Sequence, residues 1–120
     1  MSEYSTDQLV DIDVINGLKE LGDGDDGSFF EEIVNLYEDQ AQELINAISK
    51  LYSSGEYLEM GKTAHTLKGA SLNVGAKLFA DLCKKIEMAG KNNDLNGVFK
   101  DIEDLSKINE ITLIELKKHY

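Results

Sequence analysis

The chain has 120 residues, a length that suits a single domain with a core of its own. Its net charge of −11 argues against nucleic acid and anionic membranes as partners, because both repel an acidic protein. Its single cysteine excludes an internal disulfide, and no apolar run reaches the ~18 residues of a membrane span. Since no signal-peptide pattern opens the sequence, we expect residues 1–120 to form one soluble, cytoplasmic, monomeric domain.

Helical patterns dominate the first half of the chain. Residues 1–10 are polar and are expected to be frayed. A short helix is predicted over Asp11–Leu21, followed by a turn over residues 22–27 that does not fit the ligand frame of a calcium-binding EF-hand. Ser28 and Glu31 form the S-x-x-E capping box of a second helix. The inward residues of that helix recur every three or four positions: Phe30, Ile33, Tyr37, Ala41, Leu44, Ile48 and Leu51.

The third predicted helix runs to about Asn73 and has one apolar face and one unusual polar face. At about 100° per residue, its apolar positions gather on one side: Met60, Ala64, Leu67, Ser71 and Val74. His65 lies roughly 150° from that stripe, so its imidazole is predicted to face outward. Four residues share the face of His65: Gly61, Lys68, Gly69 and Leu72.

Two further helices complete the predicted fold. Gly75 ends the third helix, and the very short turn there forces the next helix to pack antiparallel beside it. The inward residues of that fourth helix are Leu78, Leu82, Ile86 and Ala89. After a turn over residues 90–93, Asp94 is predicted to cap the last helix, whose inward residues are Leu95, Val98, Ile102, Leu105, Ile108 or Asn109, Thr112 and Leu116. The sequence therefore predicts an all-α protein, an antiparallel up-down-up-down four-helix bundle with a short extra N-terminal helix.

Lysines are concentrated around the exposed histidine. Residues 61–91 contain six lysines and two acids, whereas the rest of the chain contains six lysines and 21 acids. This basic segment consists either of ordinary solvated lysines or of a surface that receives a phosphoryl group and an acidic partner. Lys68, one turn from His65, can place its ammonium against phosphoryl oxygens. Gly69 costs about 1 kcal/mol relative to alanine in a helix, and its missing side chain gives a partner room to approach.

The motif on this helix resembles that of a known family. The pattern H-x-x-K-G-x-S-x-x-x-G-A, formed by His65, Lys68, Gly69, Ser71, Gly75 and Ala76, resembles the histidine-containing phosphotransfer (HPt) domain family. The resemblance is good over roughly residues 28–91 and continues downstream in Leu78, Leu82, Cys83, Ile86 and Glu87. It implies a phosphorelay intermediate of two-component signalling, which accepts a phosphoryl group on His65 from a receiver aspartate and passes it to another receiver. The implied partners are response-regulator receiver domains, which supply the catalysis, and a sensor (hybrid) histidine kinase.

Other residues complete the predicted site. By resemblance, Glu87 is expected to hydrogen-bond one ring nitrogen of the histidine and so fix its tautomer. Lys91 either lies near the phosphoryl group, as a basic residue does in some relatives, or interacts with the dipole at its helix C-terminus. Lys84 belongs to the basic segment and is expected to contribute to binding. Leu58 and Leu72 share the exposed face of the histidine, which fits a receiver interface with an apolar centre and a charged rim.

Two other functions fit parts of the sequence. One is a phosphorylation-independent helical adaptor that binds receiver domains, although the presence of His65 and Lys68 beside Gly69 argues against it. The other is metal-assisted hydrolysis by His65 and Glu87, which no further converging ligands support. Because the sequence has neither a Walker loop nor a kinase glycine loop, we expect a protein that is not an enzyme and that holds no metal or cofactor.

Three remaining polar or reactive side chains are predicted to have no part in the chemistry. Ser71 is expected to be a small packing residue whose hydroxyl bonds to the backbone. Cys83 is expected to be a buried small hydrophobic residue. His119 is expected to be an exposed tail residue without a role.

Overall fold

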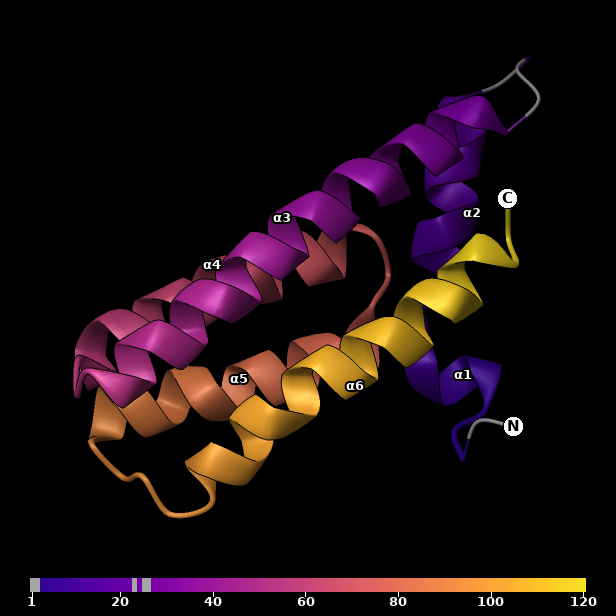
Figure 1. The fold of residues 1–120 in the computed structure, drawn as a ribbon. Helices are drawn as coiled ribbons and strands as arrows, with labels where there is room; N and C mark the ends of the chain where they lie inside the picture. The colour runs from indigo at the N-terminus through magenta and orange to yellow at the C-terminus, as the bar shows by residue number, and fades with distance from the viewer. Residues whose placement is uncertain (1–2, 23, 25–26) are drawn as a thin grey trace.

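The computed structural model describes residues 3–22, 24 and 27–120, and every regular element within them is an α-helix (Figure 1). The helices are α1 (Thr6–Leu9), α2 (Ile12–Leu21), α3 (Ser28–Ser53), α4 (Tyr57–Asn73), α5 (Lys77–Asn92) and α6 (Val98–Lys117). Within the described part of the chain, no helix is both long enough and apolar enough to cross a bilayer. The predicted all-α fold is confirmed.

The four long helices form the predicted bundle. In the bundle α3 packs against α4, α4 against α5 and α5 against α6, and α3 packs against α6 to close the ring. The inward face of α4 is the one that the sequence predicted, since Met60, Ala64, Leu67, Ser71 and Val74 are all buried. The opposite face of α4, which carries His65, is consequently exposed.

From residue 3 on, the N-terminal segment differs from the prediction that residues 1–10 are frayed, and residues 1 and 2 lie outside the described residues. Ser5 caps α1 through a full capping box, and the two residues at the end of this one-turn helix, Leu9 and Val10, are buried in the core. Burial of this apolar pair gives the segment a packing partner, which a polar frayed end lacks. Two helices, α1 and α2, therefore precede the bundle instead of one.

These two helices are joined to the turn between α4 and α5. The backbone N–H of Asp11, which caps α2, donates a hydrogen bond of 2.8 Å to the carbonyl oxygen of Gly75. Gly75 has φ of +84°, and a Cβ on it would lie 2.9 Å from the carbonyl oxygen of Asp11. A glycine is thus needed here both for the turn and for the close approach of the N-terminal segment.

The buried faces of α3 and α5 are broader than the single stripes predicted for them. In α3, Val34 and Ile45 are fully buried, while the predicted Ile33, Leu44 and Leu51 are only partly buried. In α5 the most buried residues include Phe79 and Cys83, while Leu78, Leu82 and Ala89 lie at the edge of the core. Besides its two neighbours in the ring, α3 packs against α2 and α5 packs against α1, so the apolar surface of each helix is broader than one stripe.

Two predicted boundaries on either side of the α5–α6 connection are wrong. Gly90 and Lys91 lie inside α5 and not in a turn, because the helix continues to Asn92. The last helix begins at Val98 with Gly97 as its N-cap, and Asp94 instead accepts a hydrogen bond from the backbone of Asn96 within the connecting loop. The inward residues predicted for α6 from Val98 onward are buried.

At the start of α3 the helix begins one position earlier than the predicted capping box requires, since that box needs Ser28 as the N-cap. Ser28 is the first helical residue, and Gly27, with φ of 93°, occupies the N-cap. The turn predicted over residues 22–27 lies partly outside the described residues, which do not include 23, 25 and 26.

Candidate functional site

The site depends on a close approach of α4 and α5. A Cβ on Gly61 in α4 would lie 3.0 Å from the carbonyl oxygen of Glu87, and a Cβ on Gly90 in α5 would lie 2.9 Å from the Cα atom of Gly61. Gly61 is therefore buried against α5. The helical periodicity had predicted, wrongly, that Gly61 is exposed beside the histidine. His65 lies one turn after Gly61, and Glu87 lies almost one turn before Gly90. Because the helices are antiparallel, this crossing brings the two side chains together.

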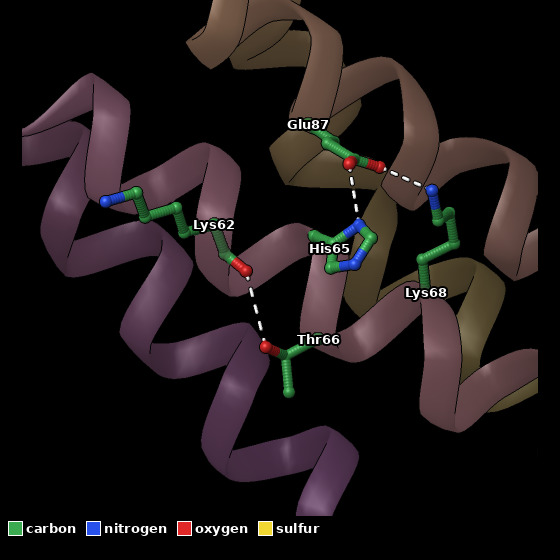
Figure 2. A network of polar contacts seen from close by, with 5 residues as sticks. All are labelled: Lys62, His65, Thr66, Lys68 and Glu87. Carbon is green, nitrogen blue, oxygen red and sulfur yellow. Dashed lines mark hydrogen bonds and ion pairs between the residues drawn. The ribbon is translucent and has the colours of Figure 1, made fainter.

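His65, Glu87 and Lys68 form one hydrogen-bonded cluster (Figure 2). The Nδ1 atom of His65 lies 2.7 Å from one carboxylate oxygen of Glu87, and the ammonium of Lys68 lies 2.7 Å from the other. The imidazole side chain is 65% exposed, whereas the side chains of Glu87 and Lys68 are only 20% and 23% exposed. The carboxylate thus has a partner on each oxygen, and the imidazole projects beyond it toward solvent.

Charge in this cluster determines which ring nitrogen is reactive. The hydrogen bond from Lys68, assisted by the one from His65, outweighs partial burial and holds the pKa of Glu87 below its usual range. An ionised carboxylate can only accept hydrogen bonds, so Nδ1 of His65 must carry the proton that it shares with Glu87. In the neutral imidazole the lone pair then lies on Nε2. The arrangement can present Nε2 as a nucleophile to an electrophile that approaches from solvent.

A hollow beside the imidazole contains two further lysines. It is lined by Leu58, Gly61, Lys62, His65, Thr66, Glu87 and Lys91. The structure thus brings the predicted Leu58 and Lys91 next to His65. Lys62 and Thr66 were not predicted from the sequence to be part of the site. Viewed down the helix axis, however, Lys62 lies about 60° from His65 on one side, and Lys68 lies about 60° from it on the other.

Other predicted residues lie elsewhere around the site. Leu72 is exposed on the same face of α4, as predicted, but outside the hollow. Lys68 was expected to face phosphoryl oxygens, yet its ammonium contacts Glu87. Lys84 lines a separate hollow with Asp81 and other residues near the α5–α6 loop, so the structure does not bring it to His65. Among the described residues, no three His, Cys, Asp or Glu side chains cluster in a way that could hold a metal ion.

The predicted environments of Ser71 and Cys83 are confirmed, and that of His119 is not. The hydroxyl of Ser71 is buried and donates to the carbonyl oxygen of Leu67 at 2.7 Å, which confirms its predicted bond to the backbone. Cys83 is buried as predicted, and burial raises the pKa of its thiol to about 12. The exposure predicted for His119 is wrong, because its side chain is only 25% exposed and its Nε2 atom lies 3.2 Å from a carboxylate oxygen of the buried Glu115.

Comparison with known proteins places this site in a family. A family model for the Hpt domain matches residues 32–116, from the start of α3 to the end of α6, and so includes the whole cluster. The chain belongs to the Hpt domain family. The resemblance noted in the sequence is thereby confirmed, and membership supports a phosphotransfer role in a phosphorelay.

Solved structures of Hpt proteins share the fold. This Hpt domain is similar to histidine-containing phosphotransfer protein B (HptB) from Pseudomonas aeruginosa, with 25% identity, a TM-score of 0.81 and 91% of each chain covered. It is also similar to the histidine-containing phosphotransfer protein MtHPt2 from Medicago truncatula, with 22% identity and a TM-score of 0.82, over 94% of this chain and 78% of that one. A search of curated protein sequences finds no significant match.

Gly69 in the Hpt motif is not required by packing within the chain. It lies in the exposed part of α4, and a Cβ on it would meet nothing within 4 Å. We therefore expect Gly69→Ala to stabilise the domain by about 0.5–1 kcal/mol, because alanine has the higher helix propensity. Denaturant unfolding of the two proteins measures the difference. A loss of stability would mean that the chain itself needs this glycine.

The low pKa of Glu87 makes its contribution to stability dependent on pH. A carboxyl group whose pKa is lower in the folded state stabilises the fold above its unfolded pKa, and the contribution is lost as the pH falls through the folded value. We expect the stability difference between the wild type and Glu87→Gln to be largest above about pH 5 and to shrink as the pH falls further. Unfolding curves at several pH values measure it. A difference that stays constant down to acidic pH would contradict the proposed ionised cluster.

Proposed function

We propose that this Hpt domain is a phosphorelay intermediate that accepts a phosphoryl group on His65 from a receiver aspartate and passes it to another receiver. The observation that carries the proposal is the Glu87 carboxylate 2.7 Å from Nδ1 of an imidazole that is 65% exposed. The other ring nitrogen, Nε2, is left as the acceptor. The proposed partners are response-regulator receiver domains and a sensor hybrid histidine kinase, and the domain acts in the cytoplasm as a monomer.

The transfer needs few groups from this chain. The Nε2 lone pair of His65 attacks the phosphorus of an aspartyl phosphate, and the bond between phosphorus and the aspartate oxygen breaks to release the carboxylate. The ring then carries a positive charge, which the ionised Glu87 stabilises through the proton on Nδ1. In the onward step a carboxylate oxygen of the second receiver attacks the phosphorus, and the N–P bond breaks. The chain is a carrier and substrate in this scheme, and not an enzyme.

A labelling experiment tests the proposal. The domain is incubated with receiver domains that carry a radioactive phosphoryl group on aspartate, and the label is followed over time. We expect transfer to the domain of a label that is labile in acid and stable in base, located in the peptide that contains His65. A domain that binds receivers but takes up no label would contradict the proposal and favour the adaptor function.

Leu72 offers a test of where receivers dock. It is exposed on the face of α4 that carries His65, and isolated exposed leucines usually have no function. We expect Leu72→Asp to weaken receiver binding by at least about 1 kcal/mol, or fivefold, because it removes apolar contact and adds a charge that opposes an acidic partner. Titration of the domain with a receiver measures the affinity.

A matched control for docking lies on α6, the helix that does not pack beside α4 in the ring. Ile114 is also an exposed apolar residue, and Ile114→Asp is expected to leave receiver affinity unchanged. The melting temperature should change little in either variant. Equal affinities for the two variants would mean that receivers do not dock on the His65 face through Leu72.

A further inference from the structure

We propose that Lys62 binds the phosphoryl group on His65 together with Lys91, for which the family resemblance already implies such a role, and that Lys68 is a positioning residue that acts through Glu87. This assignment rests on the proposed function and concerns the same site. The sequence motif predicts the opposite roles for the two lysines of α4, since Lys68 belongs to the motif and Lys62 does not. Three observations support it, one for each lysine.

Lys68 already has a hydrogen-bond partner in the unphosphorylated domain. Its ammonium lies 2.7 Å from a Glu87 oxygen, its side chain is only 23% exposed, and it does not line the hollow beside the imidazole. This hydrogen bond occupies the Glu87 oxygen that His65 does not use, and the hollow in which a phosphoryl group would lie is lined by other lysines. Loss of a charge-assisted hydrogen bond to a partly buried charge is costly. Lys68 therefore keeps Glu87 in place, and Glu87 in turn orients His65.

Lys62 lines the hollow and is only weakly held. Its ammonium lies 3.5 Å from a carboxylate oxygen of Glu59, in a pair whose side chains are 64% and 58% exposed. Such exposed pairs contribute little to stability, so the lysine can exchange Glu59 for a phosphoryl group at little cost. Lys62 is the i−3 neighbour of His65, which places their Cβ atoms about 5–6 Å apart on one helix face. That separation is within reach of a lysine side chain.

Lys91 approaches the same hollow from α5. A Cβ on Gly61 would lie 3.5 Å from the backbone nitrogen of Lys91, so this lysine begins directly opposite the turn that precedes His65. Within the described part of the chain, no carboxylate forms an ion pair with Lys91. The hollow is thus lined by one lysine from each helix, and neither lysine is held by a strong ion pair. Two ammonium groups match the nearly two negative charges of a phosphoryl group.

The stability of the phosphorylated domain distinguishes the lysines. Wild type, Lys62→Met, Lys91→Met, the double variant and Lys68→Met are phosphorylated by one labelled receiver, and the equilibrium share of label on His65 and its half-life are measured. We expect Lys62→Met and Lys91→Met each to lower that share about two- to fivefold, and the double variant to lower it about tenfold. Lys107→Met, which removes an exposed lysine of α6, is the matched control and should behave as the wild type.

The positioning role of Lys68 has its own measurement. Nitrogen-15 NMR of the unphosphorylated domain reports the chemical shifts of the two ring nitrogens of His65, which depend on the tautomer and on the hydrogen bond at Nδ1. We expect Lys68→Met to change these shifts, because Glu87 loses a partner, and Lys62→Met to leave them unchanged. If Lys68→Met lowers the phosphorylated share and leaves the ring signals unchanged, Lys68 contacts the phosphoryl group and the assignment is wrong. Normal labelling of Lys62→Met would also overturn it, whereas a wild type that takes no label would overturn the proposed function itself.

Discussion

Replacement of His65 by glutamine is expected to reduce phosphoryl uptake to background without unfolding the domain. A glutamine amide is not a nucleophile, so the acceptor atom is lost completely. The amide can still donate a hydrogen bond to Glu87, and the imidazole that it replaces is 65% exposed and contributes little packing. Uptake of label from a phosphorylated receiver and a thermal unfolding curve test the two halves of this prediction.

The second histidine provides the control for this experiment. The Nε2 atom of His119 is paired with Glu115, and its side chain is only 25% exposed, so it is poorly placed to accept a phosphoryl group. We expect His119→Gln to take up label as the wild type does. Label that persists in His65→Gln, or that disappears in His119→Gln, would show that His65 is not the acceptor.

The sequence predicted the helix that carries the site better than the helices around it. The inward residues of α4 follow one narrow stripe, so a single periodic pattern was enough to find both Met60 and the outward orientation of His65. In α3 the pattern led to Ile33 and Leu44 and missed the more buried Val34. Besides its two neighbours in the ring, α3 packs against α2, and periodicity alone does not show that a helix has this third neighbour.

The partners within the site were only partly predictable. Lys68 lies on the same helix as His65, so the wheel alone places it near the imidazole. Its contact with Glu87 depends on the distance between α4 and α5, for which the sequence offers no local signal. Glu87 was expected near the histidine only through family resemblance. Gly61 and Gly90, which determine how closely the helices approach, were interpreted as an exposed position and as part of a turn.

Gly90→Ala tests whether this close approach holds the site together. A Cβ at this position would overlap the carbonyl oxygen of Tyr57 and lie 2.9 Å from the Cα atom of Gly61. Both are backbone atoms, which cannot rotate away, so α4 and α5 must separate. Overpacking costs about 1–3 kcal/mol and occasionally more, and backbone clashes belong at the upper end. After the gain in helix propensity of about 1 kcal/mol, we expect a net loss of about 2 kcal/mol in the free energy of unfolding.

The same substitution at Gly69 is the matched control, because it adds one methyl group to the same helix pair in open space and is expected to stabilise the domain. Opposite signs for the two variants in denaturant unfolding would separate steric crowding from helix propensity. Separation of the helices should also lengthen the contact between Glu87 and His65, which the nitrogen-15 chemical shifts of the ring detect by NMR. If Gly90→Ala is as stable as Gly69→Ala and leaves those shifts unchanged, the spacing of α4 and α5 does not depend on the missing side chain.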